Sequence, residues 1–183
     1  MLYTRKGDTG TTKTFGCDQR VSKSSTVSEA LGTLDEINSF LGICKTASAE
    51  SNFSFEDEAV SNIIDAVQQT LFSIQAELAG ADKHVGEEKI KWVERIIDGI
   101  EKKLPPIKSF FVSGGTKLAA QFDFARTLAR RAERRVVGVS EEGKITIGPH
   151  TLPFLNRLSS LLYALARFAN HSANITEEKP NYK

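Results

Sequence analysis

Three arginines recur at every fourth position of one segment, the spacing of residues on one side of a helix. Arg126, Arg130 and Arg134 would form this stripe. Glu133 follows Arg130 by three residues and would lie on the same side. Like charges at this spacing destabilise an isolated helix by roughly 0.2 to 0.5 kcal/mol per pair, so we expect a compensating anion or carboxylate. The stripe adjoins a line of small apolar positions, namely Ala125, Ala129 and Ala132.

The alternative compensation is water with scattered carboxylates, as on most charged helix faces. The position of the stripe beside an apolar line, rather than opposite it, favours a bound polyphosphate or a partner carboxylate. Arg131 and Arg135 would point further outward and are weaker candidates.

Two further polar groups lie on predicted helices. Asp35, Asn38 and Ser39 form a patch beside an apolar stripe, and Asp35 could supply a carboxylate to an arginine. A solvated helix face is the other interpretation. A second series recurs every seven residues near the C-terminus, at Asn156, Tyr163 and Asn170. Core amides would explain that spacing equally well.

The N-terminal segment 3–13 offers backbone N–H groups, hydroxyls and cations, which are the ingredients of a phosphate cradle. The GxxxxGK[ST] spacing is absent, and no GxGxxG follows a strand. The sequence therefore argues against P-loop and Rossmann nucleotide sites. A flexible tail is the alternative interpretation of this composition.

Composition argues against several other classes of function. The 24 Lys and Arg residues nearly balance the 23 Asp and Glu residues, so no overall basic field would draw the protein to nucleic acid or to an anionic membrane. The three histidines are far apart, and we expect no metal site made by protein ligands. Cys17 and Cys44 cannot form a disulfide framework, and we find no signal peptide or membrane span. We expect a cytoplasmic protein.

Helical periodicity accounts for most of the 183 residues and predicts the elements that would position these groups. The first helix is expected from Thr26, in a capping box, to about Ala47. The others are expected from about Ser54 or Asp57 to Gly80, about 90–104, about 116–139, and from about 151 through 168. Pro105-Pro106 would end the third helix. We expect no strand pairs and predict an all-α five-helix bundle in one domain (1–183), with an N-terminal loop (1–25), a bundle (26–175) and a tail (176–183).

Five segments, in order along nearly the whole chain, resemble the PduO-type ATP:cob(I)alamin adenosyltransferases, also called cob(I)yrinic acid a,c-diamide adenosyltransferases. The segments are 3–10 (YTRKGDTG), 32–39 (GTLDEINS), Phe110 with 114–116 (GGT), 125–126 (AR) with 130–134 (RRAER), and 155–159 (LNRLS). The resemblance implies a homotrimer whose active sites lie at subunit interfaces. It also implies transfer of the 5'-deoxyadenosyl group of ATP to the cobalt of cob(I)alamin, with release of triphosphate.

The resemblance also implies roles for individual residues. ATP, with Mg2+ on its triphosphate, would be bound by Thr4, Arg5, Lys6, Gly7, Thr12, Lys13, Lys23, Arg130, Arg131, Glu133, Arg134 and Asn156. Asp35 and Arg126 would form an ion pair across the subunit boundary. Phe110 would displace the lower axial ligand of cobalt and so ease its reduction, and Phe111 would lie beside it in the cobalamin site. Without the resemblance, both phenylalanines would be interpreted as core aromatics.

Two departures from the family pattern leave other interpretations open. Ser24-Ser25-Thr26-Val27 stands where many relatives have an Asp-x-Arg type segment, and Ser113 stands where proline is frequent. The tail 179–183 lacks a clear phenylalanine to cap the pocket, which leaves its role as a lid open. One alternative is a non-catalytic carrier or sensor of ATP or cobalamin, and another is a structural bundle. A cobalamin reductase and an adenosylcobalamin-dependent enzyme are the expected protein partners.

Overall fold

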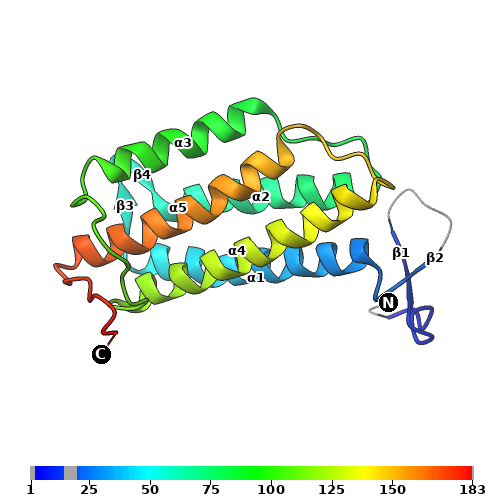
Figure 1. The fold of residues 1–183 in the computed structure, drawn as a ribbon, viewed down its shortest axis with the longest axis horizontal. Coiled ribbons are helices and arrows are strands. Elements are labelled where there is room, and N and C mark those ends of the chain that lie inside the picture. Colours follow the sequence, from blue (N-terminus) through cyan, green and yellow to red (C-terminus); the bar gives the residue numbers. More distant parts are fainter. Residues whose placement is uncertain (1–2, 15–19, 183) are drawn as a thin grey trace.

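Five helices make up most of the computed structural model, which describes residues 3–14 and 20–182. They are α1 (Thr26–Glu50), α2 (Val60–Leu78), α3 (Glu87–Glu101), α4 (Lys117–Glu142) and α5 (Thr151–Ser172). α1 packs against α2 and α4, while α5 packs against α4 and α3. Figure 1 shows α3 on the outside of this arrangement. The predicted all-α five-helix bundle is confirmed, and none of the described helices is long and apolar enough to span a membrane.

The apolar stripes of the helices meet in one core. Its largest fully buried side chains include Leu34, Ile63, Leu71, Phe122 and Phe154. The line of small residues on α4 is also fully buried, at Ala125, Ala129 and Ala132. Small side chains there allow α4 to lie close to its neighbours, with the arginine stripe at the edge of the contact. Cys44 is buried in the same core, whereas Cys17 lies outside the described residues.

Helix boundaries differ from expectation where capping decides them. The N-cap of α1 is Ser25, one residue before the predicted position, because its side chain accepts the N–H of Ser28. α4 extends to Glu142 and ends at Gly143, whose left-handed φ of 66° suits glycine. α3 begins and ends three residues earlier than predicted, so Leu104 lies outside it.

The expectation that strand pairs are absent was wrong. β1 (Thr11–Lys13) and β2 (Arg20–Ser22) form an antiparallel pair with Thr12 opposite Val21. The Arg20 side chain stabilises this N-terminal hairpin by donating to Thr11 Oγ1 and to the Thr11 carbonyl, both at 2.8 Å. A second pair, β3 (Ser54–Phe55) with β4 (Glu58–Ala59), occupies the segment predicted to start α2.

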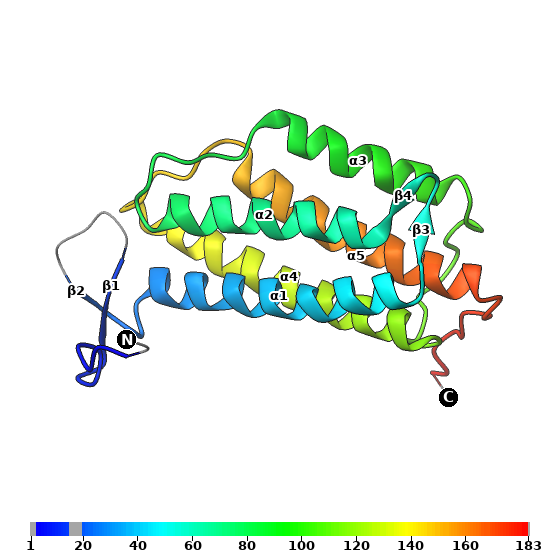
Figure 2. The same cartoon turned by 180° about the vertical axis from the view of Figure 1, so that it is seen from behind.

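The N-terminal hairpin and the C-terminal tail lie at opposite ends of the molecule. Figures 1 and 2 show the hairpin beyond the first turn of α1, and the tail beside the start of α4 at the other end. The connection between α3 and α4, which carries Phe110, runs near the tail. One chain therefore keeps its N-terminal hairpin far from this connection.

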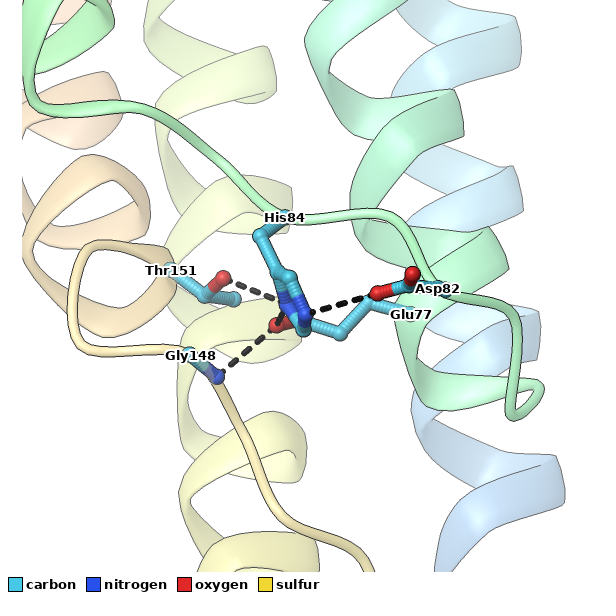
Figure 3. Close-up of polar contacts among 5 residues, drawn as sticks. All are labelled: Glu77, Asp82, His84, Gly148 and Thr151. Atoms are coloured by element: carbon cyan, nitrogen blue, oxygen red, sulfur yellow. Dashed lines mark hydrogen bonds and ion pairs between the residues drawn. The ribbon is translucent and has the colours of Figure 1, made fainter.

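A buried carboxylate holds together the connections at the hairpin end. Glu77, near the end of α2, accepts the N–H of Gly148 at 2.8 Å and the hydroxyl of Thr151 at 2.5 Å. His84 Nδ1 lies 2.7 Å from the same carboxylate, and Figure 3 shows these groups converging on it. Because a carboxylate only accepts hydrogen bonds, His84 Nδ1 carries the proton. Glu77 thus joins α2 to the start of α5.

Candidate functional site

Four predicted ATP-site residues come together between α4 and α5. Arg130, Glu133, Arg134 and Asn156 line a surface pocket of about 280 Å³ together with Val137. Asn156 Nδ2 donates to Glu133 Oε1 at 2.9 Å, which fixes the amide and the carboxylate against each other. Helical spacing places the α4 residues on one side, and the packing of α4 on α5 brings Asn156 to them. Two guanidinium groups in one small pocket are suited to a polyanion.

The remaining arginines of the segment point elsewhere. Arg131 forms an ion pair with Glu36 of α1, and it does not line the small pocket. Arg135 Nη2 lies 3.9 Å from Glu29 Oε2, also on α1. In the described chain, carboxylates of α1 balance these two arginines. The sequence interpretation that they point away from the stripe agrees with this arrangement, and the expected role of Arg131 in ATP binding stays a prediction.

A larger pocket lies beside the first. It measures about 540 Å³ and is bounded by α4, α5, the 107–113 segment and the tail. Its walls combine aromatic groups with charged groups, among them Phe110, Asp123, Arg126, Tyr163 and Arg167. Arg130 lines both pockets, so they adjoin at its side chain.

Phe110 is not a core aromatic, because 80% of its surface is exposed. It lies in the connection between α3 and α4, where Pro105-Pro106 excludes a helix, and it borders the larger pocket. Phe111 also lines this pocket, and its ring centroid lies 5.2 Å from Cζ of Arg167. The core interpretation therefore fails for Phe110. An exposed aromatic ring at a pocket edge is available to a flat ligand.

Arg126 has a carboxylate neighbour that sequence reasoning missed. Its Nε lies 3.7 Å from Asp123 Oδ1, and its guanidinium lies 5.9 Å from the centre of the Tyr163 ring. Burial raises the pKa of the Asp123 carboxyl and that of the Tyr163 phenol. Asp35 is exposed on α1, and no pair with Arg126 is present within the described residues of this one chain. The i, i+3 spacing of Asp123 and Arg126 was the available sequence signal.

The N-terminal hairpin and the residues directly before and after it carry the predicted phosphate-cradle residues. The seven predicted positions are Thr4, Arg5, Lys6, Gly7, Thr12, Lys13 and Lys23. Lys23 packs on Gly7, where an added Cβ would lie 3.1 Å from Lys23 Nζ. The backbone N–H of Lys23 donates to the Gly10 carbonyl at 2.9 Å, and Arg20 also donates to the Lys6 carbonyl. Arg20, which sequence reasoning did not select, therefore shapes this loop.

Within residues 3–14 and 20–182, no group of three His, Cys, Asp or Glu side chains could hold a metal ion. The carboxylate of the small pocket is Glu133, with the Asn156 amide beside it. A metal ion in this pocket would need further oxygen ligands, beyond Glu133 and Asn156, from something other than protein side chains.

The fold and the site together define a helical bundle in which a cationic pocket adjoins a larger, partly aromatic one. Residues 2–169 match the family model described as cobalamin adenosyltransferase. The chain belongs to the cobalamin adenosyltransferase family.

Curated relatives and solved structures agree with this assignment. The chain is 40% identical over 187 residues to the corrinoid adenosyltransferase PduO of Salmonella typhimurium, covering 97% of this chain and 53% of that one. It is 38% identical over 180 residues to the corrinoid adenosyltransferase of Bacillus subtilis, covering 95% and 89%. The chain thus spans about half the length of the Salmonella relative.

A solved variant of the PduO-type ATP:corrinoid adenosyltransferase from Lactobacillus reuteri, in complex with cobalamin and ATP, has the same fold. The TM-score is 0.87 at 32% identity, covering 100% of this chain and 97% of that one. Another variant of that enzyme, in complex with ATP, gives a TM-score of 0.85 at 32% identity, covering 98% and 100%.

Proposed function

We propose that this protein transfers the 5'-deoxyadenosyl group of ATP to the cobalt of cob(I)alamin and releases triphosphate. The observation that carries the proposal is the position of Arg130, which lines both the small cationic pocket and the larger aromatic one. A triphosphate in the first pocket and a corrin ring in the second would meet at this residue. Family membership and relatives solved with both ligands support the same assignment.

The chemistry requires no nucleophile from the protein. The electron pair of Co(I) attacks the 5' carbon of ATP, a Co–C bond forms, and the C–O bond breaks with its electron pair leaving on triphosphate. The chain would hold the two substrates in line and stabilise the negative charge that develops on the leaving group. Arg130 and Arg134 are the residues we assign to that charge. Magnesium would neutralise part of it, and Glu133 offers an oxygen ligand of the kind that Mg2+ prefers.

Phe110 is assigned to the corrinoid rather than to ATP. Its exposed ring borders the larger pocket and does not line the smaller one. A ring there can exclude an axial donor from the cobalt, and loss of that donor makes reduction to Co(I) easier. Phe111 would complete the same wall. A reducing compartment, the cytoplasm, suits both Co(I) and the buried thiol of Cys44.

We further propose that each site is shared between chains of a homotrimer. In one chain the N-terminal hairpin and the Phe110 connection lie at opposite ends (Figures 1 and 2), and we assign the cradle of each site to the hairpin of a neighbouring chain. Ile43 of α1 and Phe124 of α4 are exposed by 50% and 54%, which supplies apolar surface for subunit contacts. Asp35, exposed on α1, is then available to Arg126 of a neighbouring chain.

An assay with ATP and chemically reduced cob(I)alamin tests the activity. Wild-type protein is expected to form adenosylcobalamin and triphosphate in equal amounts. Removal of one donor to developing charge costs about 10² to 10³ in rate, which is the loss we expect for Arg130→Ala. Arg135→Ala is the matched control, since Arg135 lies on the same helix but lines neither pocket. Ligand binding without any product would favour the carrier or sensor alternative.

The variant Phe110→Ala tests whether binding of ATP and reaction of the corrinoid depend on different residues. It is expected to leave the Kd for ATP nearly unchanged and to slow product formation when the corrinoid is supplied as Co(II) with a reductant. A parallel loss of ATP affinity in Phe110→Ala and Arg130→Ala would contradict the assignment.

Subunit mixing tests the shared site. Lys6 lies in the turn before the N-terminal hairpin and Arg130 lies in the pocket, and the homomers of Lys6→Ala and of Arg130→Ala are each expected to be inactive. Mixed assemblies would regain activity if the two residues of one site come from different chains. No recovery in demonstrably mixed trimers would contradict the shared site.

A further inference from the structure

Arg167 is an almost fully buried arginine on the last helix. Only 5% of its surface is exposed, and it forms an ion pair with Glu177 of the tail. Its Nε lies 3.1 and 3.0 Å from the two Glu177 oxygens, and its Nη2 lies 2.9 Å from Oε2. Removing two charges from water is costly unless both are well satisfied. The bidentate interaction between the Arg167 guanidinium and the Glu177 carboxylate supplies that compensation.

The same guanidinium holds the segment that carries Phe110. Nη2 of Arg167 donates to the Pro105 carbonyl at 3.1 Å, and its Cζ lies 5.2 Å from the centre of the Phe111 ring. The backbone N–H of Val112 donates to the Glu178 carbonyl at 2.8 Å, so the segment and the tail are also joined directly. Arg167 therefore connects α5 to two separate stretches of chain.

The far end of that segment is held one helical turn further along α5. Asn170 Nδ2 donates to the Gly114 carbonyl at 2.9 Å, and Asn170 Oδ1 accepts the N–H of Thr116 at 2.9 Å. Asn170 is itself buried. Two side chains of α5, three residues apart, thus fix both ends of the stretch from Pro105 to Thr116.

Arg167 also forms part of a wall. Together with Phe111 and Glu177 it lines both the larger pocket and a neighbouring pocket of about 390 Å³. No other described residues are shared by these two pockets. Loss of the ion pair would loosen this wall, and none of its three residues lines the small cationic pocket.

We propose that Arg167, through its buried ion pair with Glu177, is a positioning residue that holds the Phe110 segment and the C-terminal tail as walls of the corrinoid pocket. The inference rests on the proposed function. It predicts that the ion pair matters for the corrinoid and not for ATP, because Arg167 lines the larger pocket and does not line the small one. The tail then forms part of the corrinoid site, and the ion pair between Arg167 and Glu177 holds it there. No phenylalanine cap from the tail is required.

Three variants test the role. Arg167→Met removes the guanidinium and leaves the Glu177 carboxylate, whose side chain is only 18% exposed, without its partner. Arg167→Met with Glu177→Leu removes both charges, and a buried pair replaced by apolar groups commonly still folds. Arg167→Lys keeps the charge but loses the fork geometry. Arg95→Met, an exposed arginine on the outer helix α3, is the matched control.

Two readouts separate positioning from a general loss of structure. The kcat/KM for the corrinoid is expected to fall at least about tenfold in the single and double Met variants, with the Kd for ATP changed by less than about twofold. Arg167→Lys is expected to recover part of the loss. The visible spectrum of Co(II) corrinoid bound in the presence of ATP should differ from that of wild-type protein, because the cobalt environment depends on the Phe110 segment.

Parallel losses for ATP and corrinoid, or wild-type corrinoid parameters in the double variant, would overturn the role of Arg167. The proposed function can fail separately. If wild-type protein binds both ligands without turnover, the adenosyl transfer is refuted, while titration of the visible spectrum still decides whether Arg167 positions the corrinoid wall. If wild-type protein binds no corrinoid at all, both are overturned.

Discussion

Glu77 is a buried charged side chain whose removal we expect to have a large local effect on stability. Its side chain is 1% exposed and accepts hydrogen bonds from Gly148, Thr151 and His84 (Figure 3). Glu77→Ala leaves the Gly148 N–H and the hydroxyl of Thr151 without their acceptor, and Thr151 is fully buried. Each unsatisfied donor costs about 1 to 3 kcal/mol, so the two together cost roughly 2 to 6 kcal/mol. His84 is solvent-exposed and is left out of this sum.

The expected loss is large enough to measure by thermal denaturation. For a chain of this size, 1 kcal/mol corresponds to about 2 to 4 °C in Tm, which gives a decrease of roughly 4 to 24 °C for Glu77→Ala. Glu77→Gln keeps one acceptor oxygen and should lose about half as much. Glu50→Ala is the matched control, because Glu50 is an exposed glutamate at the end of α1.

Hydrogen exchange locates the effect. The amides of 143–151 are expected to exchange faster in Glu77→Ala, since the carboxylate is what holds this connection to α2. A Tm within the error of wild-type protein, or faster exchange spread evenly over all helices, would refute the reasoning.

Three further predictions concern single positions. The hydrogen bond to Glu77 raises the pKa of His84, so the stability that His84 adds is fully present below its unfolded pKa of about 6.5 and is lost as the pH rises through the folded value. The Tm difference between wild type and His84→Ala should therefore be larger at about pH 6 than at about pH 9. A larger difference at about pH 9 would contradict this role of the hydrogen bond to Glu77. Burial raises the pKa of Cys44 to about 12, so in a Cys17→Ala background a thiol reagent should label no cysteine until denaturant is added. Gly115 has φ of 94° and packs on Asn170, so Gly115→Ala should lower the free energy of unfolding by about 1 to 3 kcal/mol. Denaturant titration measures this, with Gly32→Ala in α1 as the control that should not destabilise.

Much of the candidate site could be predicted because its spacing is local. A helix repeats every 3.6 residues, so Arg130, Glu133 and Arg134 had to share a side wherever α4 packed. The apolar line of α4 likewise predicted which face would be buried. The N-terminal segment was selected as a phosphate cradle, which stays a prediction. Its hairpin was missed, because three-residue strands carry too little alternation to be distinguished from a loop.

The partners of charged side chains could not be predicted in the same way. Arg131 forms an ion pair with Glu36, which lies 95 positions away in the sequence, and Arg126 lies beside Asp123 on its own helix. The packing of α1 against α4 selects Glu36 for Arg131, whereas the pair of Asp123 and Arg126 lies within α4 at i, i+3 spacing. The ion pair between Asp35 and Arg126 stays a prediction for the assembled protein.

The sequence by itself determined the helices, their buried faces and the arginine stripe, because all three follow from periodicity within one segment. Tertiary structure alone decided that Arg130 joins two pockets, that Phe110 is exposed, and that Arg167 and Glu177 pair in a buried wall. Each of these depends on where a connection without regular structure lies against a helix. Such positions are set by contacts between distant residues, and no local pattern encodes them.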